Sequence, residues 1–97
     1  MNNALNSIAE QARPIFQKYG FRKVGLFGSR ARGDYRNDSD VDFLVAFDIP
    51  QSFFHQEAAR QELEAIFGVS VDLVPDTRVI ARMRPFIAQD LQIIYEK

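Results

Sequence analysis

The sequence predicts a single α/β domain over residues 1–97, built as a small mixed sheet flanked by helices. Two observations carry this expectation. Segments whose apolar residues recur three or four positions apart alternate with short runs rich in β-branched and aromatic residues, without repeats or low-complexity tracts. In addition, a length of 97 residues suits one hydrophobic core and is too short for two.

The first two elements are a helix and a strand. Apolar side chains recur at helical spacing from Leu5 to Tyr19, and Gly20 then provides a residue that commonly ends a helix. Pro14 should kink this helix or mark an early break. The run "FRKVGLF", residues 21–27, predicts a buried strand.

A second strand and a second long helix follow. The run "VDFLVAF", residues 41–47, is rich in the residue types that strands favour. From about Phe53 an apolar stripe that includes Leu63 and Ile66 predicts a helix that ends at Gly68. We expect both of these stripe residues to be buried.

The last part of the chain predicts a third strand and short helical turns. "VSVDLVP", residues 69–75, predicts a strand, and the strand, helix, strand order makes it parallel to residues 41–47 through a right-handed crossover. The tail, residues 76–97, should form short helical turns around Pro85, with Pro85 at the start of one. "QIIYE", residues 92–96, is a candidate for a last short strand.

Charge is unevenly distributed along the chain, although the net charge is only -1. Residues 1–37 carry seven basic and two acidic side chains, residues 38–76 carry one and nine, and residues 77–97 carry four and two. This pattern fits solvated helix faces, and it equally fits a site that meets an anion on one side and a cation on the other.

Several classes of function are excluded or disfavoured. The absence of cysteine excludes disulfides, thiolate catalysis and cysteine-ligated metal sites. His55 is the only histidine, so a metal site that needs two histidines is impossible. The sequence contains no apolar run of about 18 residues and no signal peptide pattern, so we expect a cytoplasmic protein without membrane contact.

Acidic residues interrupt two of the predicted strands. Asp40 and Asp42 lie two positions apart at the start of residues 41–47, so their side chains point the same way, and Asp72 interrupts residues 69–75 similarly. If these strands are neighbours, three carboxylates converge, and their repulsion favours a bound divalent cation, magnesium or manganese ahead of zinc. Alternatively, Asp72 faces water on an edge strand, and Asp40 and Asp42 close a turn.

The dipeptide Gly28-Ser29 directly follows the first predicted strand. Glycine lets the backbone approach a ligand closely, and a turn of helix from about Ser29 would direct N–H groups and a hydroxyl toward a phosphate. A simple turn with Ser29 as helix N-cap explains the dipeptide equally well. Arg30 and Arg32 are candidates to neutralise phosphate oxygens, with solvated loop charges as the alternative.

Together these residues resemble a known motif. Gly28-Ser29, ten residues, then Asp40-x-Asp42, with a later Asp72 in a strand, resembles the DNA polymerase β-like nucleotidyltransferase superfamily. The stretch "FGSRARGDYRNDSDVDFLV" is similar to its minimal nucleotidyltransferase (MNT) branch, which includes the antitoxins of HEPN/MNT toxin-antitoxin pairs. The resemblance implies a single-domain polymerase β-like nucleotidyltransferase fold.

The resemblance also implies an activity, namely transfer of AMP from ATP to a hydroxyl, with a tyrosine of a partner HEPN toxin as the expected acceptor. Two magnesium ions, with manganese as a substitute, are the implied cofactors. Under this interpretation the catalytic and metal-binding residues are Asp40, Asp42 and Asp72, and the nucleotide-binding residues are Gly28, Ser29, Arg30 and Arg32.

Two other functions fit the same residues. The protein could be a catalytically silent antitoxin that neutralises its partner by binding, with the acids kept as a remnant. It could also transfer nucleotides to a small molecule of the aminoglycoside type. No direct binding of nucleic acid is expected in any of the three cases.

Overall fold

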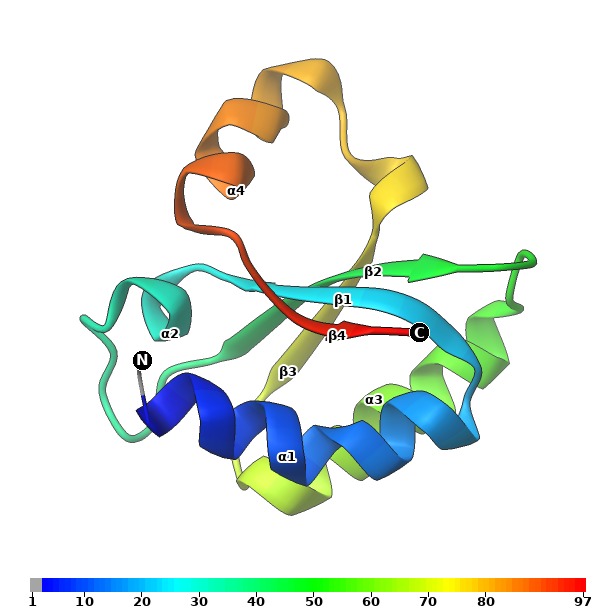
Figure 1. The fold of residues 1–97 in the computed structure, drawn as a ribbon, viewed down its shortest axis with the longest axis horizontal. Helices are drawn as coiled ribbons and strands as arrows, with labels where there is room; N and C mark the ends of the chain where they lie inside the picture. Colours follow the sequence, from blue (N-terminus) through cyan, green and yellow to red (C-terminus); the bar gives the residue numbers. More distant parts are fainter. Residues whose placement is uncertain (1–2) are drawn as a thin grey trace.

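The computed structural model describes residues 3–97, in which four strands form one mixed sheet with helices on both faces (Figure 1). Its elements are α1 (Asn3–Lys18), β1 (Phe21–Phe27), α2 (Ser29–Arg32), β2 (Val41–Phe47), α3 (Phe53–Phe67), β3 (Val71–Pro75), the 3₁₀ turns Asp76–Arg78 and Ala81–Met83, α4 (Arg84–Asp90) and β4 (Gln92–Glu96). No helix among these residues is both long and apolar enough to cross a membrane. The α/β class and the small mixed sheet are therefore confirmed.

The strand order is β3-β2-β1-β4, and only β2 and β3 are parallel. These two strands are joined by α3, because a parallel connection needs a crossover that returns the chain to the same end of the sheet. β1 lies antiparallel to both β2 and β4. The predicted parallel pair and the short final strand are both present, and β3 is shorter than predicted because it starts at Val71.

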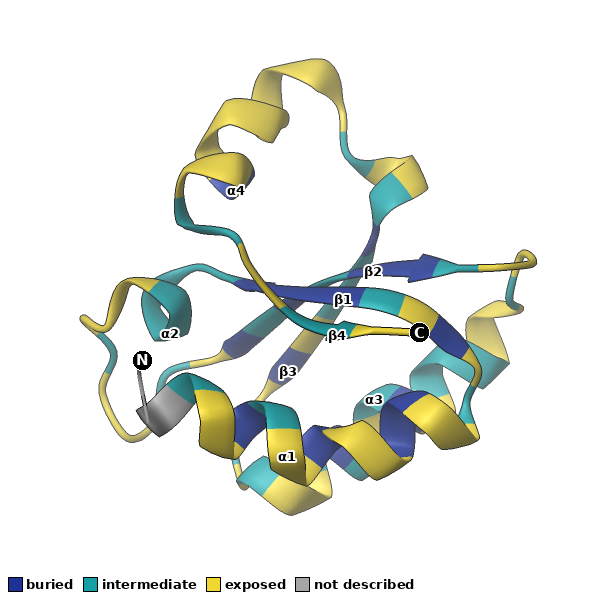
Figure 2. Cartoon of the chain, viewed as in Figure 1, coloured by how far each residue is buried: buried dark blue, intermediate teal, exposed yellow. Residues whose placement is uncertain are grey.

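The main core lies between the sheet and the two long helices, α1 and α3, which cover one face (Figure 2). Phe16 of α1 is fully buried at its centre, with its ring stacked on Phe21 at 5.3 Å between centroids and edge-on to Phe43 at 5.6 Å. Aromatic pairs at such distances stabilise a core beyond the apolar area they bury. This cluster packs α1 against both central strands, β1 and β2.

The segment from β3 to β4 forms an arch over the opposite face of the sheet (Figure 1). Ile87 is the one buried residue of α4, and it lines a shallow hollow with Leu44 of β2 and Leu91. A side chain at position 25 would collide with Leu91, so Gly25 allows this close packing against β1. The arch therefore rests on the sheet through a few apolar contacts, and most of its surface is exposed (Figure 2).

Two local expectations need correction, namely an early break of α1 at Pro14 and the burial of Ile66. α1 continues through Pro14 without a break, because Pro14 is exposed and water can satisfy the carbonyl that loses its helical hydrogen bond. Ile66 is 41% exposed, whereas Leu63 is fully buried. The apolar stripe of α3 is wide, and only its inner edge meets the sheet.

This difference within α3 yields a stability test. Leu63→Ala should lower the free energy of unfolding by roughly 2 to 5 kcal/mol, because it leaves a cavity in the core. Ile66→Ala is the matched control, and it should cost about 1 kcal/mol or less because its side chain is already partly in water. Urea denaturation measures both values, and equal losses would contradict the packing described for α3.

Candidate active site

The three predicted carboxylates lie at one corner of the sheet. Asp42 of β2 and Asp72 of β3 are direct partners in the parallel register, and Asp40 immediately precedes β2. The side chains of Asp40 and Asp72 are exposed, and that of Asp42 is half-buried. The prediction that Asp42 and Asp72 lie on neighbouring parallel strands is thus confirmed, whereas the convergence of all three carboxylates stays a prediction.

The surroundings of Asp42 shift the pKa of its carboxyl group. Burial raises the pKa of its carboxyl, and repulsion from Asp72 and then from Asp40 raises it further, while Arg32 opposes the shift. Each of these effects except the last disfavours the ionised form. The corner is therefore a place where added positive charge would be stabilising.

Gly28 stands directly against Asp42. It follows Phe27, which pairs with Asp42 across β1 and β2, and its backbone has φ 78° and ψ -159°, a conformation essentially confined to glycine. A Cβ atom at position 28 would lie 2.5 Å from Asp42 Oδ2. Glycine is therefore required both by the turn and by the closeness of the carboxylate.

The turn places Ser29 at the first position of α2, beside the acidic corner. The Gly28 carbonyl accepts hydrogen bonds from the N–H groups of Ala31 and Arg32, both at 3.1 Å, and the Ser29 carbonyl accepts one from Gly33 at 2.9 Å. These bonds close a compact turn whose first residue, Ser29, is only half-buried. Ser29 therefore directly follows the glycine that stands against Asp42.

The two arginines of α2 make contacts that the sequence did not predict. Arg32 is ion-paired with Asp34 (Nε to Oδ2, 3.2 Å) and with Asp90 at the end of α4 (Nη1 to Oδ2, 2.9 Å). Arg30 instead donates to backbone carbonyl groups of the segment between α2 and β2. Phosphate binding by either arginine stays a prediction, and these contacts are the ones that a phosphate would compete with.

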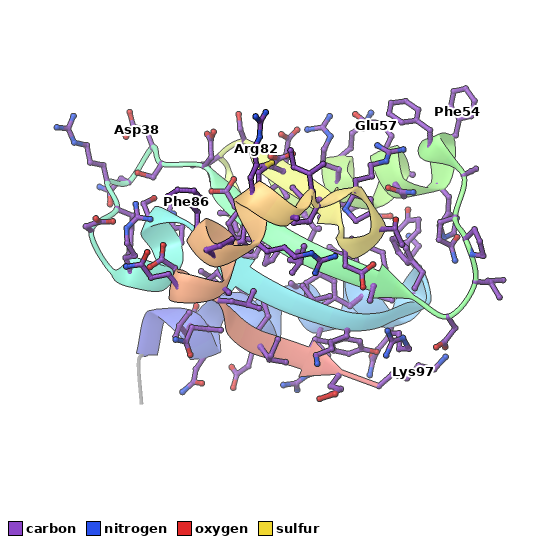
Figure 3. All side chains as sticks on the ribbon, turned by 90° about the horizontal axis from the view of Figure 1, so that it is seen from above. Asp38, Phe54, Glu57, Arg82, Phe86 and Lys97 are labelled. Atoms are coloured by element: carbon purple, nitrogen blue, oxygen red, sulfur yellow. The ribbon has the colours of Figure 1, made fainter. Side chains whose placement is uncertain are left out.

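Asp90 has no local signal in the sequence, because it is a single acid in the C-terminal tail. Only the fold brings it to Arg32, and it links the arch to the Gly28-Ser29 turn. Figure 3 shows that Arg82 and Phe86 also come from this arch, while Asp38 lies on the loop before β2. The acidic corner is thus bordered by α2, by this loop and by β3.

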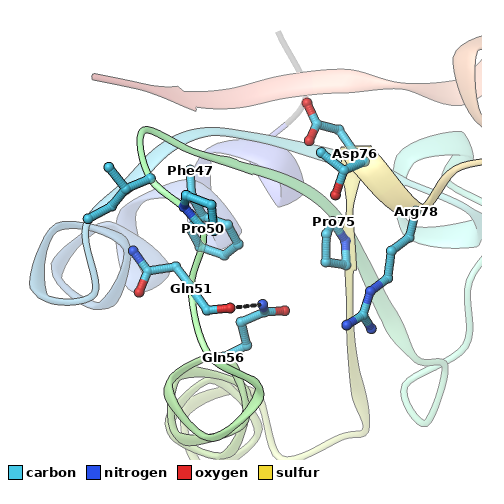
Figure 4. A pocket seen from close by; sticks show the side chains of 9 residues that line it. Phe47, Pro50, Gln51, Gln56, Pro75, Asp76 and Arg78 are labelled. Atoms are coloured by element: carbon cyan, nitrogen blue, oxygen red, sulfur yellow. Dashed lines mark hydrogen bonds between the residues drawn. The ribbon is translucent and has the colours of Figure 1, made fainter.

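Two hollows, which share Gln56 and Arg78 in their lining, lie beside β3. One of about 350 Å³ includes Asp72, with Arg60 and Glu57 of α3 and Arg78 in its lining. Another of about 260 Å³ lies at the carboxyl ends of β2 and β3, where Gln56 Nε2 donates to the Gln51 carbonyl at 3.1 Å (Figure 4). Only the first of these two hollows contains one of the predicted acids, and neither is lined by Gly28, Ser29, Asp40 or Asp42.

The donor set of the corner fits a hard divalent cation, because carboxylate oxygens are the ligands that magnesium and manganese prefer. The raised pKa of Asp42 marks negative charge that such a cation would offset. Within residues 3–97, however, no three acidic or histidine side chains are gathered closely enough to hold a metal ion as they stand.

Comparison with known proteins gives a consistent result. Residues 9–95 match the family model described as a nucleotidyltransferase domain. The protein adenylyltransferase MntA of Thermococcus cleftensis is 43% identical over 62 residues, which cover 64% of this chain and 63% of that protein. The match thus spans less than two thirds of the length of this relative.

Solved structures share the fold. One provisionally described as a minimal nucleotidyltransferase superposes with a TM-score of 0.76 at 32% identity, covering 91% of this chain and 90% of that one. A chain from the complex of a tri-AMPylated HEPN toxin of Shewanella oneidensis with its MNT antitoxin superposes with a TM-score of 0.74, covering 96% of this chain and 73% of that one. Because the identity to this second structure is only 14%, the similarity to it concerns the fold alone.

The contact between Gly28 and Asp42 can be tested by substitution. Gly28→Ala should destabilise the protein by about 3 kcal/mol or more, because it adds a clash to an unfavourable backbone conformation. Gly33→Ala is the control, since Gly33 also has a positive φ, of 90°, but has nothing within 4 Å of an added Cβ. This variant should lose only about 1 to 2 kcal/mol.

A double substitution isolates the clash. Asp42→Ala should recover a measurable part of the loss in a Gly28→Ala background, and thermal or urea denaturation of the four proteins gives the coupling energy. A coupling energy of zero would show that Gly28 and Asp42 do not touch.

The raised pKa of Asp42 predicts a pH-dependent stability. The unfolded chain loses this proton at a lower pH than the folded protein, so the fold loses stability as the pH rises above the unfolded pKa, and the loss is complete once the pH exceeds the raised pKa of the folded state. Asp42→Asn should therefore be more stable than the wild type at pH 7 in the presence of a chelator, and this gain should vanish below about pH 3. Asp38→Asn, on the exposed loop, is the control, and a loss of stability in Asp42→Asn at pH 7 would refute the assignment.

Proposed function

The chain belongs to the nucleotidyltransferase domain family, and on that premise we propose that it transfers AMP from ATP to a hydroxyl group of a partner protein. The proposed acceptor is a tyrosine of a HEPN-domain toxin, for which the chain would be the antitoxin. The observation that carries this proposal is the pairing of Asp42 with Asp72 directly beside the Gly28-Ser29 turn. It supports a site in which acids and a phosphate-binding turn face the same ligand.

The nucleotide would lie across the start of β2. Gly28 and Ser29 would bind the β- and γ-phosphates, because glycine leaves the backbone open to close approach and serine supplies a hydroxyl. Arg32 would add positive charge on the same side, since it already acts electrostatically on Asp42. The triphosphate would thereby be oriented with its α-phosphorus toward the acids.

Asp40, Asp42 and Asp72 would hold the divalent cations, proposed as two magnesium ions with manganese as a substitute. Bound there, the cations would neutralise charge on the triphosphate and favour ionisation of the acceptor hydroxyl. Asp42 would be ionised in that state, because positive charge nearby lowers the pKa of a carboxyl. The two exposed acids would complete the site by side-chain rotation when nucleotide arrives.

The reaction is an in-line displacement. The acceptor oxygen forms a bond to the α-phosphorus while the bond from that phosphorus to the oxygen bridging the α- and β-phosphates breaks, and pyrophosphate leaves. Asp72 would accept the hydroxyl proton, a role supported by its exposure and by the open hollow that it lines. Positioning and charge neutralisation supply most of the catalysis in such transfers.

The similar proteins support the acceptor class. The Thermococcus relative is named a protein adenylyltransferase, and the Shewanella complex contains an AMPylated HEPN toxin. An alternative function, silencing by binding alone, is favoured by one observation. The three carboxylates are not gathered into a metal site within the described part of the chain.

AMP transfer requires the metal-binding acids, whereas silencing by binding alone does not. Substoichiometric protein with ATP and magnesium should add AMP to a HEPN-domain protein encoded beside it, seen by mass spectrometry as steps of about 329 Da. Asp40→Ala/Asp42→Ala should abolish the mass increase, and Asp38→Ala is the control that should retain it. If the double variant silences its partner fully and the wild type adds no mass, the protein is an occluding antitoxin.

A further inference from the structure

Arg30 organises the loop that carries Asp40. Its Nη2 donates to the Ser39 carbonyl at 2.8 Å and to the Asn37 carbonyl at 3.3 Å, and its guanidinium carbon lies 4.4 Å from the centre of the Tyr35 ring. One side chain from α2 thus contacts three residues of the segment between α2 and β2, which projects at the edge of the fold (Figure 1).

These contacts fix the backbone on one side of Asp40. The Ser39 carbonyl, which Arg30 binds, belongs to the peptide group that joins Ser39 to Asp40. On the other side, the Val41 N–H donates to the Ser70 carbonyl at 2.9 Å. Asp40 is therefore anchored between two hydrogen bonds, one from Arg30 and one from the segment that leads into β3.

The rest of the loop provides less restraint. Within it, the Ser39 N–H donates to the Arg36 carbonyl at 3.0 Å, and the Arg36 N–H donates to Ser39 Oγ at 2.8 Å. These bonds close a local turn but do not connect it to the sheet. Among the described residues, Arg30 provides the side-chain link between this turn and the Gly28-Ser29 turn.

The shape of the guanidinium matters for this role. Its flat face covers the Tyr35 ring, one nitrogen serves two carbonyl groups, and Nε is buried without a hydrogen-bond partner in the described structure. A side chain held in this way has little freedom to turn toward a phosphate. A lysine could keep the charge, but its ammonium group has no flat face to stack on the Tyr35 ring while it donates to the two carbonyl groups.

We propose that Arg30 is a positioning residue that sets Asp40 in place for the divalent cation, and that it does not act as a phosphate ligand. This inference rests on the proposed function, because it assumes that Asp40 binds the cation. Residues that orient metal ligands typically contribute 10- to 100-fold to metal affinity. Loss of Arg30 should therefore mainly raise the metal concentration that is needed to half-fill the site.

The test is a manganese titration of the full chain at saturating ATP, followed by the thermal shift and by electron paramagnetic resonance of free Mn²⁺. Arg30→Ala and Arg30→Lys should both raise the Mn²⁺ concentration for the half-maximal shift roughly tenfold or more. At saturating Mn²⁺ their affinity for ATP should return to within about threefold of the wild type, because the phosphate ligands are intact. Tyr35→Ala, which removes only the stacking, should cause a smaller change in the same direction.

Arg36→Ala is the matched control, since it removes an arginine from the same loop but keeps the backbone bonds of Arg36 to Ser39. It should behave as the wild type. If Arg30→Ala does not fold, Arg30→Lys and Tyr35→Ala decide the question.

Two results would overturn the inference and leave the proposed function intact. The first is that Arg30→Lys reaches its half-maximal thermal shift at the same Mn²⁺ concentration as the wild type. The second is that Arg30→Ala still binds ATP weakly at saturating Mn²⁺. The second result would make Arg30 a phosphate ligand. Absence of any metal-dependent shift in the wild type would overturn the proposed function and, with it, this inference.

Discussion

The parallel pairing of β2 with β3 is the constraint on which the candidate site depends. Its register is set by buried side chains, since Val41, Phe43 and Val45 on β2 face the core and Val71 does so on β3. A slip of one residue would turn these side chains to the wrong face of the sheet. The same alternation that buries them leaves Asp42 and Asp72 side by side on the opposite face, so core packing determines the geometry of the acids.

The candidate site combines one acid in a central strand with two acids on exposed segments. Asp42 is held in a central strand against Gly28, whereas Asp40 lies on a loop and Asp72 on an exposed edge strand. A rigid acid fixes where a ligand sits, and exposed acids can rotate to meet it. Accordingly, the three carboxylates share one corner of the sheet, but within the described residues they do not surround a single point.

The two arginines of α2 illustrate how connections across the fold surround the turn. Arg32 reaches the C-terminal arch through Asp90, and Arg30 reaches the loop before Asp40. Gly28 and Ser29 therefore sit between two segments that come from different parts of the chain. A change in either segment would be transmitted to the turn through a hydrogen-bonded guanidinium, a group whose planar geometry makes its contacts directional.

The sequence by itself determined the order of the helices and strands, the position of the Gly28-Ser29 turn and the identity of the three acids, because each depends on short-range periodicity or on residue type. It did not determine which side of the α3 stripe is buried, so Ile66 was wrongly placed in the core. The pairing of Asp72 with Asp42 was predicted on the condition that their strands are neighbours, and tertiary structure alone decided that Arg32 pairs with Asp90 and that Arg30 holds the loop of Asp40. The physical reason is that these contacts join residues whose separation in sequence carries no local signal, and they exist only once packing has fixed the register of the sheet.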